Sequence, residues 1–364
     1  MYAGILGYVY FRRVQLQPID EFLTVDRPIL DVRSPGEFAR GHIPGAINLP
    51  LFSNDERAIV GTLYKQQGRE VALLEGLRIV GPKLASIVER ARVAAPDGKI
   101  AVHCWRGGER SASVAWLLDK AGGFDVHVLK RGYKAFRHHV LSSFTEPLPV
   151  MILGGYTGSG KTEILHALRE LGEQVVDMEG LANHRGSSFG ALGLPPQPTT
   201  EHFENLLWSE LRKLDRSRPI WLEDESMMIG RARVPDGIYF QLRKAQVLFI
   251  DMPKKIRAQR LVKDYGKADP KELREAILRI QKRLGPQHAK AALEALEEGD
   301  LLTVAMATLT YYDKTYSRGA SQRVPSSLHR LPCNDTDPNA TASQLRALAH
   351  ECLGSHLARP PHAV

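Results

Sequence analysis

Residues 154–162 read GGYTGSGKT and constrain the fold more than any other stretch of the 364-residue chain. From Gly155 onward they match the phosphate-binding loop pattern G-x-x-x-x-G-K-[ST] at every fixed position. Residues 150–153 are a short apolar run typical of a buried strand, and residues 163–171 have the apolar spacing of a helix. When a strand, a glycine loop and a helix follow one another in this order, the backbone N–H groups of the loop, the helix N-terminus and a lysine surround an anion. The stretch predicts a di- or triphosphate site made by Gly155, Gly158, Ser159, Gly160, Lys161 and Thr162.

The chain before this loop alternates between short apolar runs and helical patterns. Strands are expected at 29–33, 100–102 and 126–129, and helices at 77–93 and 112–120. Glycines and prolines punctuate residues 34–50, which predicts a loop and a turn. Strands that alternate with helices predict an α/β fold with a parallel sheet.

A cysteine follows the strand predicted at 100–102, in a loop that opens a helix. Cys104 begins the loop and Arg110 closes it; Trp105, Arg106, Gly107, Gly108 and Ser111 complete it. Backbone N–H groups, a helix N-terminus and arginines favour a thiolate and bind anionic substrates. We therefore expect Cys104 and Arg110 to be catalytic, the alternative being a buried structural cysteine. Cys333 and Cys352 have no such surroundings, and the absence of C-x-x-C spacing fits a reducing cytoplasm.

These stretches resemble a known domain family. Residues 31–50 (DVRSPGEFARGHIPGAINLP) and 103–111 (HCWRGGERS) are similar to the two signatures of rhodanese domains. The resemblance implies a cysteine that carries a chalcogen as a persulfide. Arg110 lies six positions after Cys104, whereas the commonest sulfurtransferase loops place the arginine at five. The longer spacing resembles that of the dual-specificity phosphatases built on this fold, and it predicts a wider anion cradle.

The second half offers further ligand-facing candidates. Residues 180–190 are rich in glycine and polar groups, and we expect His184, Arg185 and Ser187 to face the ligand, although a solvated loop is the alternative. The apolar strand predicted at 220–222 runs into three acids, where a carboxylate that holds Mg²⁺ would lie. Asp224 is one candidate, Glu223 and Glu225 are the others, and no metal site is certain.

A basic tract follows the strand predicted at 247–251. Residues 251–290 hold 12 lysines and arginines against 5 aspartates and glutamates, a net +7 of the chain's +8. Leu273, Ile277, Ile280 and Leu284 have helical spacing and predict an apolar seam. Lys271, Arg274, Arg279, Lys282 and Arg283 would lie on the rest of that helix. The tract is either a solvated face or a contact to a nucleic-acid backbone.

The whole chain, from about 15 to 316, resembles the bacterial tRNA 2-selenouridine synthases, through the stretches above and residues 311–316 (YYDKTY). The resemblance implies a rhodanese-like parallel-sheet domain at 15–142 and a P-loop NTPase-like α/β domain at 148–320 with a helical C-terminal extension. A polar tail with a short helix at 342–353 would occupy residues 321–364. The resemblance to this family also implies a cytoplasmic enzyme that has no tightly bound cofactor and that could use Mg²⁺. Its substrates would be selenophosphate, geranyl diphosphate and the anticodon loop of a tRNA with 2-thiouridine at the wobble position, converted through an S-geranyl intermediate.

Two other interpretations remain. A P-loop kinase or ATPase fused to a phosphatase-like rhodanese module would explain the loop length. A tRNA-binding module with the P-loop as a nucleotide switch would explain the basic tract. The apolar residues 1–11 are too few for a membrane-spanning helix and are expected to form a first strand or a frayed start.

Overall fold

A computed structural model describes residues 14–266, 268–334 and 336–357, and the chain divides between Ser143 and Phe144 into two compact units. The first strand or frayed start expected at residues 1–11 lies outside the described residues. Within them, no helix is both long and apolar enough to cross a membrane.

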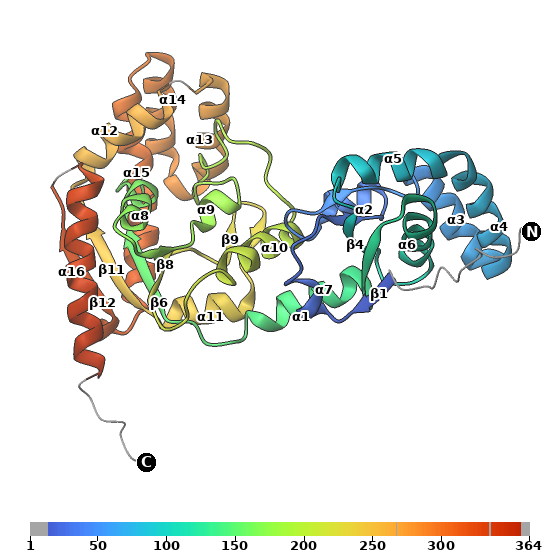
Figure 1. Ribbon diagram of the computed structural model, residues 1–364. Helices are drawn as coiled ribbons and strands as arrows, with labels where there is room; N and C mark the ends of the chain where they lie inside the picture. The colour runs from blue at the N-terminus through green and yellow to red at the C-terminus, as the bar shows by residue number, and fades with distance from the viewer. Residues whose placement is uncertain (1–13, 267, 335, 358–364) are drawn as a thin grey trace, which may run out of the picture. The chain divides into compact units, whose positions relative to one another are not determined.

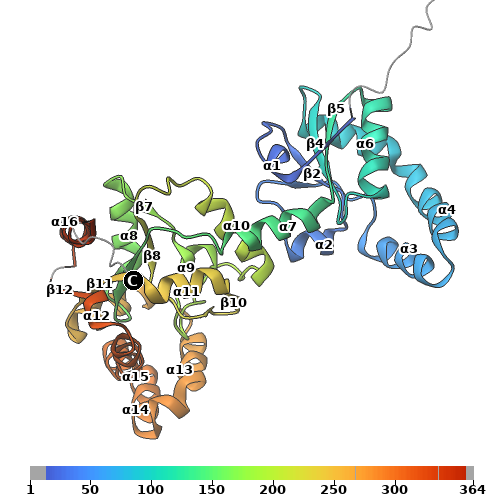
Figure 2. The same ribbon diagram turned by 90° about the horizontal axis from the view of Figure 1, so that it is seen from below.

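The first unit is built on a parallel five-stranded sheet with the order β1-β5-β4-β2-β3 (Figure 1). The strands are β1 (Val14–Gln17), β2 (Ile29–Asp31), β3 (Ile47–Asn48), β4 (Lys99–His103) and β5 (Asp125–Leu129). Helices α1 (Ile19–Phe22) and α7 (Gly132–Ser143) lie on one face, and α5 (Leu84–Ala94) and α6 (Glu109–Gly122) lie on the other (Figure 2). Parallel strands covered on both faces explain why β4 and β5 read as apolar runs.

Helices α2, α3, α4 and α5 of this unit depart from the sequence prediction. The segment 34–50 contains α2 (Pro35–Arg40), because Ser34 caps it and Glu37 completes a capping box. The single helix expected at 77–93 is two, α4 (Arg69–Val80) and α5, separated by a 3₁₀ turn at Gly81–Lys83. Pro82 explains the break, since it has no N–H to continue the ladder. Helix α3 (Asn54–Gln66) was not predicted; it packs against α4 as a hairpin.

The second unit has its own parallel sheet, with the order β12-β11-β6-β8-β7. The strands are β6 (Val150–Gly155), β7 (Gln174–Val175), β8 (Ile220–Glu223), β11 (Gln246–Asp251) and β12 (Leu328–Pro332). The remaining elements of its α/β part are α8 (Lys161–Glu170), α9 (Met178–Leu181), α10 (Thr200–Leu211), the hairpin β9 (Met228–Ile229) and β10 (Ala232–Arg233), and α11 (Asp236–Lys244).

Four helices form a subdomain beside this sheet (Figure 1): α12 (Lys254–Tyr265), α13 (Pro270–Leu284), α14 (Pro286–Glu297) and α15 (Leu301–Ser321). The predicted seam of α13 is confirmed, because Leu273, Ile277, Ile280 and Leu284 are all buried in one core cluster. The five basic residues predicted for its other faces are exposed.

The expectation of a separate polar tail at 321–364 is wrong. A 3₁₀ turn (Pro325–Ser327) leads into β12, which pairs with β11, and α16 (Pro338–Leu357) packs against α8. Leu345, Cys333 and Cys352 are buried in the same core as Trp221 and Leu165. The polar composition of this segment hid its role in the core, because the five-residue edge strand β12 and the single apolar stripe of α16 need few apolar residues.

Candidate functional site

The loop that starts at Cys104 lies at the carboxyl end of β4 and is shaped by two glycines. Gly107 has φ +63°, and a Cβ there would lie 2.7 Å from the Leu129 carbonyl oxygen. Gly132 has φ +57°, and its Cβ would lie 2.3 Å from the carbonyl oxygen of Cys104. Only glycine fits either place, so the loop is held against the backbone that follows β5.

Cys104 is 3 % exposed, and its Sγ lies 3.2 Å from the Oγ of Ser111, in the first turn of α6. The Ser111 hydroxyl also lies 3.1 Å from the Gly108 carbonyl oxygen, to which it donates its single proton. A thiolate at Cys104 would take that proton into a hydrogen bond instead. Ser111 can therefore stabilise the charged sulfur without moving its own Oγ.

Arg110 connects the cysteine loop to the first signature. Its guanidinium donates to Glu37 at 2.7 Å, and the pKa of Glu37 is below its usual value because these bonds outweigh the effect of burial. Behind it, the fully buried Asp31 and Arg33 form a two-pronged pair, and Arg33 also donates to the Gly41 carbonyl at 2.7 Å. The signature thus fixes the loop around Glu37, and Glu37 orients the arginine.

Cys104 is among the residues that line a cavity of about 890 Å³. Its lining includes Cys104, Trp105 and Gly108 together with one acid, Glu109, and the five cations Arg57, Lys65, Arg69, Arg106 and Arg110. Arg69 donates to Glu109 at 2.8 Å, so that acid is neutralised within the lining. The excess of positive charge suits an anionic substrate.

The phosphate-binding loop has backbone angles that non-glycine residues rarely adopt. Gly155, Gly158 and Gly160 have φ of +155°, +81° and +77°. A Cβ on Gly158 would lie 3.0 Å from the Arg257 carbonyl, and one on Gly160 would lie 2.4 Å from the Arg260 guanidinium. Ser159 is buried, and its Oγ has no partner. The loop leads directly into α8, whose N-terminus faces the same space.

Lys161 is buried among groups that keep it charged. Its Nζ donates to the Gly155 carbonyl at 3.3 Å and lies 5.5 Å from the centre of the Tyr316 ring. Burial lowers the pKa of Lys161, but the interactions with Tyr316, Glu179 and Glu225 outweigh it, and the net pKa is raised. The ammonium is therefore available to an anion at physiological pH.

Two acids stand beside the phosphate-binding loop. The Thr162 hydroxyl lies 3.4 Å from Glu179 Oε2, and Glu179 shares a hydrogen bond with Glu225. Burial, followed by the charge of Glu179, raises the pKa of Glu225 well above 4.5; burial likewise raises that of Glu179. Two buried carboxyls that resist losing both protons are suited to a cation.

The three acids predicted after β8 have different roles. Asp224 lines a cavity, and its carboxylate is ion-paired with Arg323 and, at 3.3 Å, with Arg243. Glu223 accepts from the Met178 N–H at 3.0 Å. Of the three acids, Glu225 is therefore the one that interacts with Lys161, and its Oε1 is buried without a hydrogen-bond partner. Together with Glu179 and Thr162 it fits Mg²⁺, which takes one or two carboxylates plus phosphate oxygens. Across the described residues no cluster of three or more His, Cys, Asp or Glu side chains suits a metal ion.

Sequence reasoning missed Arg257, which fastens the phosphate-binding loop to the YYDKTY segment on α15. Asp313 forms two bonds of 2.9 and 3.0 Å with Arg257, which in turn donates to the Thr157 carbonyl at 3.1 Å. From the same helix, Tyr312 accepts from the Ser188 N–H at 3.0 Å. Spacing could not identify Arg257, because it is one of many cations in the basic tract.

A cavity of about 770 Å³ lies beside the glycine-rich segment 180–190. His184 and Ser187, which were predicted to face a ligand, line this cavity. Arg185 lies instead over the ring of Tyr265, 5.4 Å from its centre. The lining is rich in arginines and hydroxyl-bearing side chains: Arg231, Arg243, Arg279, Arg283, Tyr239, Tyr311, Tyr312, Thr315 and Tyr316. Of the basic tract, Arg279 and Arg283 reach this cavity. Cations and tyrosine rings together suit phosphates and stacked bases.

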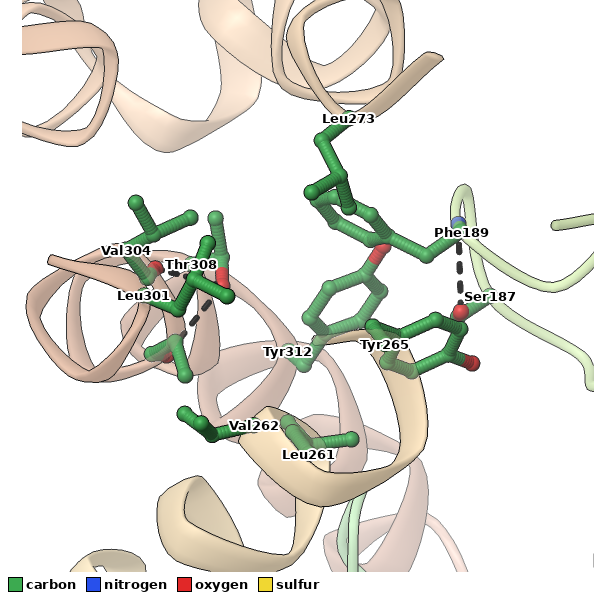
Figure 3. A pocket seen from close by; sticks show the side chains of 11 residues that line it. Ser187, Phe189, Leu261, Val262, Tyr265, Leu273, Leu301, Val304, Thr308 and Tyr312 are labelled. Carbon is green, nitrogen blue, oxygen red and sulfur yellow. Dashed lines mark hydrogen bonds between the residues drawn. The ribbon is translucent and has the colours of Figure 1, made fainter. Parts of the chain in front are cut away.

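A smaller cavity of about 50 Å³ shares Ser187 and Tyr312 with the larger one. Figure 3 shows the rings of Phe189 and Tyr265, with that of Tyr312 from α15, on one side of it. Leu301, Val304 and Thr308, also from α15, lie on the other side. Its lining is apolar, and Leu261 separates it from the phosphate-binding loop: the Leu261 Cγ lies 3.0 Å from where a Cβ on Gly158 would be.

Comparisons with known proteins cover both units. Residues 16–139 match the rhodanese-like domain family, and residues 148–330 match the family described as the tRNA 2-selenouridine synthase AAA domain. A tRNA 2-selenouridine synthase of Shewanella denitrificans is 36 % identical over 353 residues, which cover 85 % of this chain and 93 % of that protein. The corresponding synthase of Bdellovibrio bacteriovorus is 35 % identical over 81 % of this chain and 89 % of its own. That of Nitrosomonas europaea is 35 % identical over 72 % and 71 %.

Proposed function

This chain belongs to the tRNA 2-selenouridine synthase family, and we propose that it replaces the sulfur of 2-thiouridine at a tRNA wobble position with selenium. The observation that carries the proposal is the presence of two separate anion cradles in one chain. One is a cysteine loop among five cations, and the other is a P-loop beside a cavity of arginines and tyrosines. A wobble base lies in a single-stranded loop, from which it can be splayed into a pocket.

The P-loop unit would carry out the first step, transfer of a geranyl group to the thione sulfur. Sulfur attacks C1 of geranyl diphosphate, the S–C bond forms as the C–O bond breaks, and pyrophosphate leaves with the electron pair. The N3–H proton of the thiouracil ring passes to water, which leaves the alkylated base neutral. Lys161, the loop N–H groups and the α8 N-terminus would stabilise that pyrophosphate. Thr162, Glu179 and Glu225 would hold Mg²⁺, which would neutralise charge on the leaving group.

The cysteine unit would release selenium from selenophosphate. We propose that the Cys104 thiolate attacks phosphorus, so that the P–Se bond breaks and selenide leaves with the electron pair. Water then hydrolyses the phosphocysteine to phosphate and thiol. A perselenide on Cys104 would need an oxidant, because selenium in selenophosphate is already at the selenide level. The six-position spacing of Cys104 and Arg110 suits a tetrahedral phosphoryl group.

Selenide then attacks C2 of the alkylated base. The C2–S bond breaks as the C2–Se bond forms, the sulfur leaves as geranylthiolate, and a proton converts it to the thiol. An S-alkyl group leaves C2 more readily than a thione sulfur, which explains why alkylation comes first. No net oxidation or reduction occurs in any step.

The phosphatase-like loop length also favours a second candidate, a P-loop kinase or ATPase fused to a phosphatase-like module. One experiment separates the two. The protein is incubated with a 2-thiouridine tRNA and geranyl diphosphate, first without and then with selenophosphate, and the nucleosides are analysed by mass spectrometry. We expect the S-geranyl nucleoside in the first reaction and 2-selenouridine in the second. An unchanged tRNA in both, with hydrolysis of ATP or an aryl phosphate, would favour the second candidate.

A further inference from the structure

An apolar cavity of about 500 Å³ adjoins the cavity of the cysteine loop. It lies between the hairpin of α3 and α4 and the outer face of α6. The two cavities are neighbours, because they share six lining residues: Phe52, Val60, Tyr64, Arg69, Glu109 and Arg110. An apolar space therefore lies next to the cavity that Cys104 lines.

The lining away from Cys104 is made of hydrocarbon. Leu73, Leu77 and Trp116 form part of it, and they are 41 %, 60 % and 57 % exposed. Val80 and Leu117 close it from within the core. Apolar side chains of this size left open beside a charged cradle mark a binding site rather than part of the core.

The charged residues of this cavity all lie where it meets the cysteine loop. Arg69, Glu109 and Arg110 line both cavities, and they are the only charged side chains among the described residues that line the apolar one. A ligand that spans the two would thus carry an anion or polar ring at one end and a hydrocarbon chain at the other. Neither selenophosphate nor 2-thiouridine has such a chain.

We propose that this cavity binds the geranyl chain of the S-geranyl base while selenide replaces the sulfur. The inference rests on the proposed function and deepens it, because it assigns a binding site in the cysteine unit to the alkyl chain of the base that the selenium step uses. As the C2–S bond breaks, the chain stays in the cavity with its sulfur as geranylthiolate, and selenium stays on C2.

The size of the cavity agrees with this occupant. About 500 Å³ is within the range of roughly 300–1,000 Å³ that is usual for small-molecule sites. The apolar cavity beside the P-loop in Figure 3 holds only about 50 Å³, too little for a ten-carbon chain without movement of Leu261 or Leu301. The geranyl chain would therefore bind more tightly in the cysteine unit, after its transfer to the base, than in the P-loop unit before the transfer.

The test uses anticodon stem-loop RNAs that carry either S-geranyl- or S-methyl-2-thiouridine, with selenophosphate and no geranyl diphosphate. The double variant Leu77→Ser/Trp116→Ser removes two exposed walls at little cost in stability. Val93→Ser, 84 % exposed on α5 and outside the cavity, is the matched control. We expect the double variant to raise KM for the S-geranyl RNA about tenfold and to leave kcat for the S-methyl RNA unchanged. Equal KM values of the wild type for the two RNAs, or an equal rise in KM for both in the double variant, would overturn the proposal.

A binding measurement separates this inference from the proposed function. S-geranyl-2-thiouridine nucleoside is titrated calorimetrically into the full-length Cys104→Ser protein, with the S-methyl nucleoside as comparison. We expect binding of the geranyl nucleoside alone, and its loss when Leu77→Ser/Trp116→Ser is added. Absence of binding refutes the geranyl site even if selenium transfer occurs. Binding without selenium transfer to any RNA would refute the proposed function and retain the site.

Discussion

The pair of Arg257 and Asp313 should decide whether the P-loop keeps its shape. Arg257 is 2 % exposed, and its guanidinium donates to the carbonyls of Met252 and Thr157 as well as to both oxygens of Asp313. The substitution Asp313→Ala leaves a buried cation without its carboxylate, which usually costs about 3–5 kcal/mol. Asp313 is 25 % exposed and two carbonyls remain, so we expect about 2–3 kcal/mol. For a unit of this size that corresponds to a fall in Tm of about 4–12 °C.

The assay follows unfolding of the P-loop unit within the full chain. The four tryptophans divide evenly, so Trp105→Phe/Trp116→Phe leaves Trp208 and Trp221 as reporters of the second unit alone. Asp236→Ala is the control, because its pair with Arg233 is about half exposed and should contribute less than about 0.5 kcal/mol. We also expect Asp313→Ala to raise KM for geranyl diphosphate, through the Thr157 carbonyl. A loss of stability no larger than that of the control would refute this account of the loop.

Three further predictions concern single sites. Glu225→Gln should raise the free energy of unfolding at pH 8 in the absence of Mg²⁺. The raised pKa of Glu225 gives stability that is complete below about 4.5 and is lost as pH rises through that pKa, so urea denaturation should show no gain for the variant at pH 4. Gly107→Ala should abolish selenium transfer and cost about 2 kcal/mol or more, because φ is +63° and the Cβ meets a carbonyl at 2.7 Å; Gly98→Ala, at φ +74° in open space, should cost about 1 kcal/mol and spare activity. Arg279→Ala and Arg283→Ala should each reduce the slope of log K against log salt for tRNA binding by about 1, and an unchanged slope would remove them from the RNA contact.

The two anion loops could be predicted from sequence because each is a local motif. A strand, a glycine turn and a helix are contiguous along the chain, so spacing alone places Cys104 directly after its strand and Lys161 at the start of its helix. The seam of α13 was predictable for the same reason, since helical periodicity depends only on neighbours along the chain. The family resemblance then joined the two units, which no periodicity could do.

The residues around those loops could not be predicted, because their roles depend on contacts between distant segments. Nothing in the order of residues 223–225 indicates that Asp224 is neutralised by Arg323, about a hundred positions later, while Glu225 meets Glu179. The contribution of β12 and α16 to the P-loop sheet was missed because pairing with β11 is non-local. The α3–α4 hairpin was missed although its apolar residues have helical spacing, a signal that a count of periodicity over 54–80 would have found.

The most direct test of the central claim separates the two steps with two variants. Wild type, Cys104→Ser and Lys161→Ala are each given a 2-thiouridine tRNA with geranyl diphosphate and selenophosphate, and each is also given a preformed S-geranyl tRNA with selenophosphate. Nucleoside mass spectrometry should show that Cys104→Ser stops at the S-geranyl base. Lys161→Ala should leave 2-thiouridine unchanged yet convert the S-geranyl tRNA to 2-selenouridine. If a folded Cys104→Ser protein also fails to transfer geranyl, or Lys161→Ala cannot convert the preformed S-geranyl tRNA, the assignment of one step to each unit is contradicted.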